Sequence, residues 1–176
     1  MAVVYFTSNA STGAESLAEA VANAQPGDVV RPDESVFERG STIEIVLASA
    51  LNVDKGLTLD ASPYRVRLDA GGAFRCAHVA VGVVATFTAF DFVNGYNGTT
   101  AGCVYSQGTL TLNRCGVYGG SATYGGGVFV GTDGGKKGAG GNIAEGKAEL
   151  AALSADAADV VVFILVQHAA FGDGAG

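Results

Sequence analysis

Carboxylates and guanidinium groups on short predicted strands are the residues of this sequence best suited to chemistry. Asp60, Asp69 and Asp91 stand singly at predicted strand ends, and Arg65 and Arg67 precede Asp69 on the same strand. Glycosidases need two carboxylates facing one bond, whereas polysaccharide lyases combine clustered, calcium-holding acids with a basic residue. Asp69 with Arg65 and Arg67 is therefore the nearest approach to a catalytic group. The competing interpretation is that strand-end aspartates accept hydrogen bonds from turn amides.

Three tyrosines beside glycine-rich corners form a candidate glycan-binding group. Tyr96, Tyr118 and Tyr124 each lie next to glycine or one residue from it. An exposed strip of such rings can stack on the faces of sugar rings. The alternative is that these tyrosines cover the edges of corners and bind nothing.

Other reactive residue types show no functional spacing. His78 and His168 each stand without a second histidine, cysteine or aspartate at ligand or triad spacing. Cys76, Cys103 and Cys115 lack the spacing of a zinc site and cannot all pair within one chain, which favours buried free thiols. No glycine-rich phosphate loop is present. We therefore expect no metal and no cofactor.

The charge and hydropathy of the chain exclude several classes of partner. The 176 residues carry a net charge of -7, so the surface should repel nucleic acid. The longest aliphatic run, Val160–Val166, is far shorter than the roughly 20 residues of a membrane helix, so we expect no membrane insertion. The first residues lack a basic segment and a cleavage site, and we expect no signal peptide within this chain.

These candidate residues must be positioned by one helix and a series of short strands. A capping box at Thr12–Glu15 and an apolar stripe predict a helix over residues 14–24, ended by the turn sequence Gln25–Asp28. Alternating segments separated by Gly, Asp, Asn or Pro then predict strands. These strands cover residues 41–46, 56–60, 65–69, 86–90 and 109–113.

An internal repeat indicates how the strands are arranged. The segment that begins at Thr86 is echoed from Thr109, an offset of 23 residues, and the offset is 24 between Tyr105 and Phe129. Short strands with glycine corners at this period predict a parallel β-helix of about four coils, in which side chains at equivalent positions form columns. The predicted fold is all-β, with the helix capping the first coil. The predicted inward residues are Leu57, Leu59, Phe87, Leu110 and Leu112.

Two segments resemble known β-helix proteins. Ala14–Val30 resembles the N-terminal signature of bacterial cell-surface proteins of the CSLREA type, in which a Ser-Leu-Arg-Glu-Ala helix precedes a Pro-Gly-Asp turn. Thr109-Leu-Thr-Leu-Asn-Arg-Cys and Ser121-Ala-Thr-Tyr-Gly-Gly-Gly-Val resemble repeats of polymorphic outer-membrane proteins and other pectate-lyase-like proteins. The resemblance covers about residues 3–131. It implies a right-handed parallel β-helix and an extracellular or cell-surface location, on a scaffold that serves adhesins and polysaccharide-active enzymes alike.

The organisation of the chain changes after residue 131. Residues 1–131 form the predicted capped β-helix, and 132–142 have the glycine and lysine composition of a linker. Residues 143–176 predict a helix over 144–155 followed by an apolar strand at 160–166, which would be either a cap or a truncated segment.

Two functional hypotheses follow. The first is a non-enzymatic structural or adhesive module of a cell-surface or secreted protein, with carbohydrate or a host or neighbouring cell surface as its partner. The alternative is a degenerate polysaccharide lyase or hydrolase acting on acidic glycans. The sequence indicates no oligomeric state.

Overall fold

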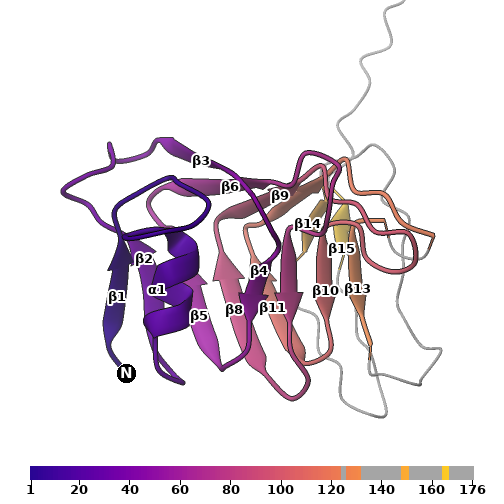
Figure 1. The fold of residues 1–176 in the computed structure, drawn as a ribbon, viewed down its shortest axis with the longest axis horizontal. Coiled ribbons are helices and arrows are strands. Elements are labelled where there is room, and N and C mark those ends of the chain that lie inside the picture. Colours follow the sequence, from indigo (N-terminus) through magenta and orange to yellow (C-terminus); the bar gives the residue numbers. More distant parts are fainter. Residues whose placement is uncertain (124–125, 132–147, 151–163, 167–176) are drawn as a thin grey trace, which may run out of the picture.

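The computed structural model describes residues 1–123, 126–131, 148–150 and 164–166, and shows a parallel β-helix with one short helix near its start. The coils stack along the long axis of the molecule (Figure 1), and each coil passes through three sheets. The prediction of an all-β parallel solenoid is confirmed. The stack has about five turns, because a strand and a helix precede the four three-stranded coils.

Three parallel sheets form the walls of the stack. Sheet 1 contains β1 (Val3–Phe6), β2 (Val29–Pro32), β5 (Leu57–Asp60), β8 (Val84–Thr88) and β11 (Thr109–Asn113). Sheet 2 contains β3 (Thr42–Val46), β6 (Arg65–Asp69), β9 (Phe90–Val93) and β12 (Gly116–Tyr118). Sheet 3 contains β4 (Leu51–Val53), β7 (Ala77–Val79), β10 (Val104–Ser106) and β13 (Val128–Val130). Successive coils therefore contribute neighbouring strands to every sheet.

Apolar side chains fill the interior, because alternate residues of each strand point inward. All five predicted inward residues are buried, each exposing 3% of its surface or less. The ring of Phe87 packs edge-on against those of Phe90 and Phe92, with centroids 5.4 and 5.3 Å apart. This aromatic cluster joins sheets 1 and 2 inside the third three-stranded coil.

The pairing of β8 with β11 corrects the predicted register. Thr111 lies beside Thr86 and Leu112 beside Phe87, so the offset is 25 residues (111 minus 86) and not 23. The predicted strand 86–90 also crosses a corner, because the backbone turns at Ala89 with a φ of 62°. A shift of two residues leaves every side chain on the same face. The side chains predicted to point inward therefore do so, although the predicted register was wrong. The predicted offset of 24 between Tyr105 and Phe129 is confirmed.

Helix α1 (Leu17–Asn23) packs against β1, β2 and β4 and closes the N-terminal end of the stack, as predicted. It starts later than expected, because the N-cap is Ser16 and not Thr12. The Ser16 hydroxyl accepts a hydrogen bond from the Glu19 amide at 3.2 Å. Both Thr12 and Ser16 have a glutamate three residues later. The later start directs Leu17 and Val21 into the core.

The carboxylate of Asp28 links the turn that follows α1 to the N-terminal end of the chain, just before β1. It accepts hydrogen bonds from the Ala2 amide at 2.6 Å and the Gln25 amide at 2.9 Å. These two bonds hold the pKa of Asp28 below its ordinary value. The ionised form of this side chain therefore contributes to the attachment of β1, the edge strand of sheet 1.

The C-terminal segments differ in part from expectation. Ala148–Leu150 is a strand, β14, where the sequence predicted helix. It pairs antiparallel with β15 (Ile164–Val166), which lies within the predicted apolar strand. Pairing with β15 explains the difference, because tertiary strand pairing can override the helix propensity even of good helix formers such as Ala, Glu and Leu. β14 lies beside β11 and β12 of the last coil. The predicted linker and the rest of 143–176 lie outside the described residues.

All three cysteines are buried free thiols, as predicted. Cys76 and Cys103 occupy neighbouring coils, where the Cys76 amide donates to the Cys103 carbonyl at 2.8 Å. Burial raises the pKa of Cys115 to about 12. The Cys115 thiol is therefore protonated at neutral pH and is not a nucleophile.

Phe87→Ala should destabilise the protein by about 3–5 kcal/mol, because it leaves a cavity among three packed rings. Urea unfolding followed by circular dichroism measures the change. Val84→Thr on the same strand is the control, since Val84 is 58% exposed, and it should shift the stability by less than about 0.5 kcal/mol. Equal effects of the two substitutions would contradict the assignment of Phe87 to the core.

Asp28→Asn should lower the melting temperature at neutral pH and reduce its dependence on acidic pH. Since the folded pKa lies below the ordinary 3.8, the stabilisation is complete above about pH 5 and is lost as the pH falls through the folded value. Thermal melts between about pH 2 and pH 7 test this window. Asp54→Asn is the control, because its side chain is 71% exposed. If the melting temperature of Asp28→Asn decreased at acidic pH as much as that of the wild type, the role of Asp28 would be refuted.

Candidate functional site

Most of the candidate residues lie on two outward faces, and Asp60 lies at the end of β5 in sheet 1. Sheet 2 carries the predicted acid and arginine group, and sheet 3 borders a pocket. Each face consists of columns, because in-register stacking places one outward side chain above another at about 4.8 Å. A column can pair opposite charges or stack rings, depending on its residues.

The outward column on sheet 2 alternates in charge. Glu44, Arg67 and Asp91 are register partners on β3, β6 and β9. Arg67 Nε lies 3.7 Å from Glu44 Oε1, and Arg65 forms a bidentate pair with Asp91 through two contacts of 2.6 Å. Hydrogen bonding to Asp91 raises the pKa of Arg65. These charges are directed at one another.

Asp69 is separate from the two arginines that precede it. Its Oδ1 accepts hydrogen bonds from the Gly71 amide at 2.9 Å and from Asn94 Nδ2 at 3.1 Å. Asp60 likewise accepts from the Ser62 amide at 2.9 Å. Both aspartates therefore make the turn hydrogen bonds of the competing interpretation. The described residues contain no group of three or more His, Cys, Asp or Glu side chains placed to hold a metal ion.

Gly116 allows the Arg65–Asp91 pair to form. It follows Asp91 in the outward column, and a Cβ at this position would overlap Asp91 Oδ1 and the ring of Tyr118. The absence of a side chain leaves room for Asp91 to be covered, and Asp91 is only 9% exposed. Tyr118 thus belongs to the surroundings of this ion pair on sheet 2.

The three predicted tyrosines do not form one strip. Tyr96 lines the pocket beside sheet 3 and is 47% exposed. Tyr118 lies on sheet 2, and Tyr124 lies outside the described residues. Tyr96 is therefore the tyrosine of this group that lines the pocket.

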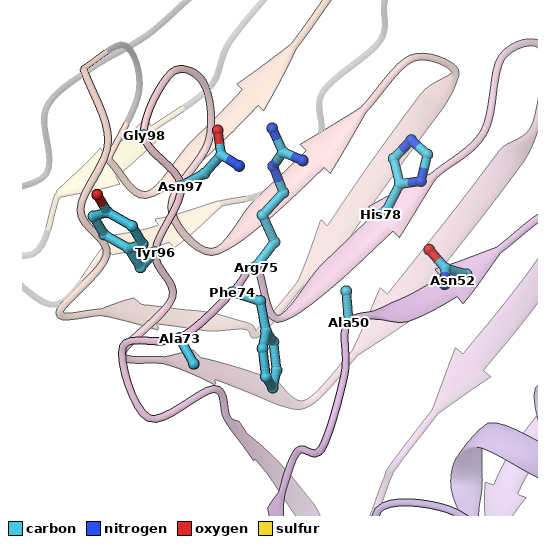
Figure 2. A pocket seen from close by; sticks show the side chains of 9 residues that line it. All are labelled: Ala50, Asn52, Ala73, Phe74, Arg75, His78, Tyr96, Asn97 and Gly98. Atoms are coloured by element: carbon cyan, nitrogen blue, oxygen red, sulfur yellow. The ribbon is translucent and has the colours of Figure 1, made fainter.

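The pocket forms at the corner between sheets 2 and 3, where the connections of the first three three-stranded coils become successively longer. The connections span residues 47–50, 70–76 and 94–103, which are four, seven and ten residues. Their side chains and the outward face of sheet 3 enclose about 270 Å³ (Figure 2). The lining residues are Ala50, Asn52, Ala73, Phe74, Arg75, His78, Tyr96, Asn97 and Gly98. Lengthening loops on a rigid stack thus build the wall of a site.

A column of rings continues from the pocket along sheet 3. His78, Tyr105 and Phe129 are register partners on β7, β10 and β13. The His78 and Tyr105 rings stack with centroids 5.4 Å apart, and Phe129 lies 5.8 Å beyond Tyr105. We call these three residues the ring column. His78 Nε2 also lies 3.2 Å from Gln107 Oε1.

Arg75 connects the pocket to the ring column. Its guanidinium carbon lies 4.7 Å from the centre of the Tyr105 ring, a cation–π contact. Nε donates to the Thr100 and Ala101 carbonyls at 3.1 and 3.2 Å, and Nη2 donates to the Thr100 carbonyl at 2.9 Å. Burial lowers the pKa of Arg75, and Tyr105 opposes that shift. The guanidinium nevertheless stays charged at physiological pH.

Sequence reasoning missed Arg75 and the ring column. Arg75 stands alone in a loop, and the three rings lie 24 to 27 residues apart (129 minus 105 and 105 minus 78). The repeat offset between Tyr105 and Phe129 was a usable signal for the column. Extending that offset back by one coil reaches the neighbourhood of His78, whose role was instead judged from its lack of metal-ligand or catalytic partners.

Gly116→Ala should destabilise the protein by about 1–3 kcal/mol, because the added methyl displaces Asp91 or Tyr118. Chemical unfolding measures the loss. Gly56→Ala is the matched control, since a Cβ there meets only the Val84 carbonyl at an ordinary 3.5 Å. If both substitutions lower the free energy of unfolding equally, close packing at Gly116 does not support the ion pair.

No family model, no curated protein and no solved structure matches this chain. Among the residues that the structure describes, no helix has both the length and the apolar character needed to cross a bilayer. The function must therefore be inferred from the geometry of the pocket and the ring column.

Proposed function

We propose that this chain is a non-enzymatic β-helix module of a cell-surface or secreted protein, and that it adheres by binding carbohydrate. The observation that carries the proposal is the ring column beside the pocket. Aromatic faces pack against the apolar faces of sugar rings, and amide and guanidinium groups at the pocket can bond sugar hydroxyls. The surface location is supported by the sequence resemblance alone.

The pocket supplies both kinds of contact. Tyr96 and His78 offer ring faces, and Asn52 and Asn97 bring amide groups from two different coils. In the close-up (Figure 2), these side chains surround one space next to Arg75. Asn97 Oδ1 accepts hydrogen bonds from the Thr99 and Thr100 amides at 3.0 and 3.1 Å. These hydrogen bonds stabilise the turn that follows Tyr96.

The contacts of the charged residues on sheet 2 favour binding over catalysis. The acids and arginines on sheet 2 pair with each other, and Asp69 is bonded to its own turn. A general acid or base needs a free position facing the substrate. The alternative of a polysaccharide lyase or hydrolase gains no specific support from these contacts.

Tyr105→Ala should weaken carbohydrate binding by about two- to tenfold, because it removes the central ring of the column and the support of Arg75. A panel of neutral and acidic oligosaccharides identifies a ligand, and isothermal titration calorimetry then measures its affinity. Tyr5→Ala on the edge strand of sheet 1 is the control, since Tyr5 is 52% exposed and far from sheet 3 in the fold.

Two outcomes would overturn the proposal. One is the absence of binding to any member of the panel by the folded wild-type chain. The other is steady turnover of a polysaccharide, because a non-enzymatic module releases its ligand unchanged.

A further inference from the structure

The pocket differs in charge from the rest of the protein. The full chain has 17 acidic and 10 basic residues. The nine lining residues include Arg75 and His78 but no aspartate or glutamate. A cationic pocket on an acidic protein creates a local potential that attracts anions while most of the surface repels them.

Arg75 has no acidic partner in the described part of the chain. The four ion pairs found there involve Arg31, Lys55, Arg65 and Arg67. Arg75 instead donates to uncharged carbonyl and hydroxyl oxygens of Thr100 and Ala101. Its positive charge is thus left uncompensated by the described residues, although burial already disfavours the charged form.

The geometry of Arg75 leaves one nitrogen for a ligand. Nε and Nη2 make the hydrogen bonds to the 94–103 connection, and Nη1 takes part in none of the hydrogen bonds between described residues. Figure 2 shows the guanidinium projecting between Asn97 and His78. Contact with Tyr105 and the bonds to Thr100 fix its plane, so little side-chain entropy is lost when an anion binds.

We infer that the pocket binds a sugar that carries an anionic group, a carboxylate or a sulfate ester, and that Arg75 Nη1 contacts this group. The inference rests on the proposed function and adds the charge of the ligand. The volume of about 270 Å³ lies below the roughly 300–1,000 Å³ of sites for drug-sized ligands. A pocket of this volume suits one substituted sugar ring. The neighbouring sugar units of the oligosaccharide would then lie along the ring column.

The test compares three ligands by isothermal titration calorimetry on the full chain. They are a glucuronate-containing oligosaccharide, its carboxyl-reduced neutral form, and a sulfated galactose oligosaccharide. The wild type should bind at least one of the two anionic ligands about tenfold more tightly than the neutral one, the worth of one charge-assisted hydrogen bond. The two anionic ligands show whether carboxylate or sulfate is preferred. The preference should decrease as salt is added.

Arg75→Gln should abolish the preference, and Arg75→Lys should retain part of it. The ratio of anionic to neutral affinity is the readout, because loss of the bonds to Thr100 can weaken all ligands together. Arg67→Gln on sheet 2 is the matched control, and it should leave the ratio unchanged. Thermal melts of each variant confirm that it is folded.

The possible results separate this inference from the proposed function. Equal affinities for neutral and anionic ligands, or a preference that survives in Arg75→Gln, would overturn the role of Arg75 but leave carbohydrate binding intact. Failure of the folded wild type to bind any of the three ligands or any member of the wider panel would overturn both.

Discussion

The structure depends on parallel, in-register stacking of successive coils. Each coil places its strands beside those of the previous coil, so equivalent inward positions meet in the same column. A residue is acceptable inside only if its neighbours along the stack accommodate its volume. The third three-stranded coil contributes the three phenylalanines Phe87, Phe90 and Phe92. Leu59 and Leu112 lie on either side of Phe87 in sheet 1. Large and medium side chains thus fill one continuous core.

The same stacking rule organises the outer faces, where packing no longer selects apolar residues. On sheet 2 the register partners Glu44, Arg67 and Asp91 alternate in sign, with Arg67 paired to Glu44 and Asp91 paired to Arg65. On sheet 3 the corresponding arrangement is a stack of rings, from His78 to Phe129. The two faces therefore have different capacities. The charges of sheet 2 are engaged in ion pairs with one another, whereas the ring column borders a pocket in which Arg75 has no acidic partner among the described residues.

The sequence predicted the fold better than it predicted the site, and the reason is periodicity. Alternation in Leu57–Asp60 and Thr109–Asn113 identifies which side chains face inward, but a period of two cannot distinguish registers that differ by two residues. The corner at Ala89 carried no glycine to mark it, and the predicted strand continued through it. The neighbours of Tyr96 depend on the sheets that its loop joins, and those of Tyr118 depend on the sheet to which its strand belongs. That information resides in pairing across coils and not in local sequence.

The location of the pocket follows from where the stack tolerates variation in length. Strands must keep their register, and the connections from sheet 1 to sheet 2 shorten to the single residue Ala89 between β8 and β9. The connections from sheet 2 to sheet 3 instead grow to ten residues, and a surface loop of this kind costs little extra closure entropy. The ten-residue connection 94–103 supplies Tyr96, Asn97 and the carbonyls that accept hydrogen bonds from Arg75. The sugar-binding capacity that we propose thus depends on the long connections at one corner, while the columns beneath them keep the spacing on which the stack depends.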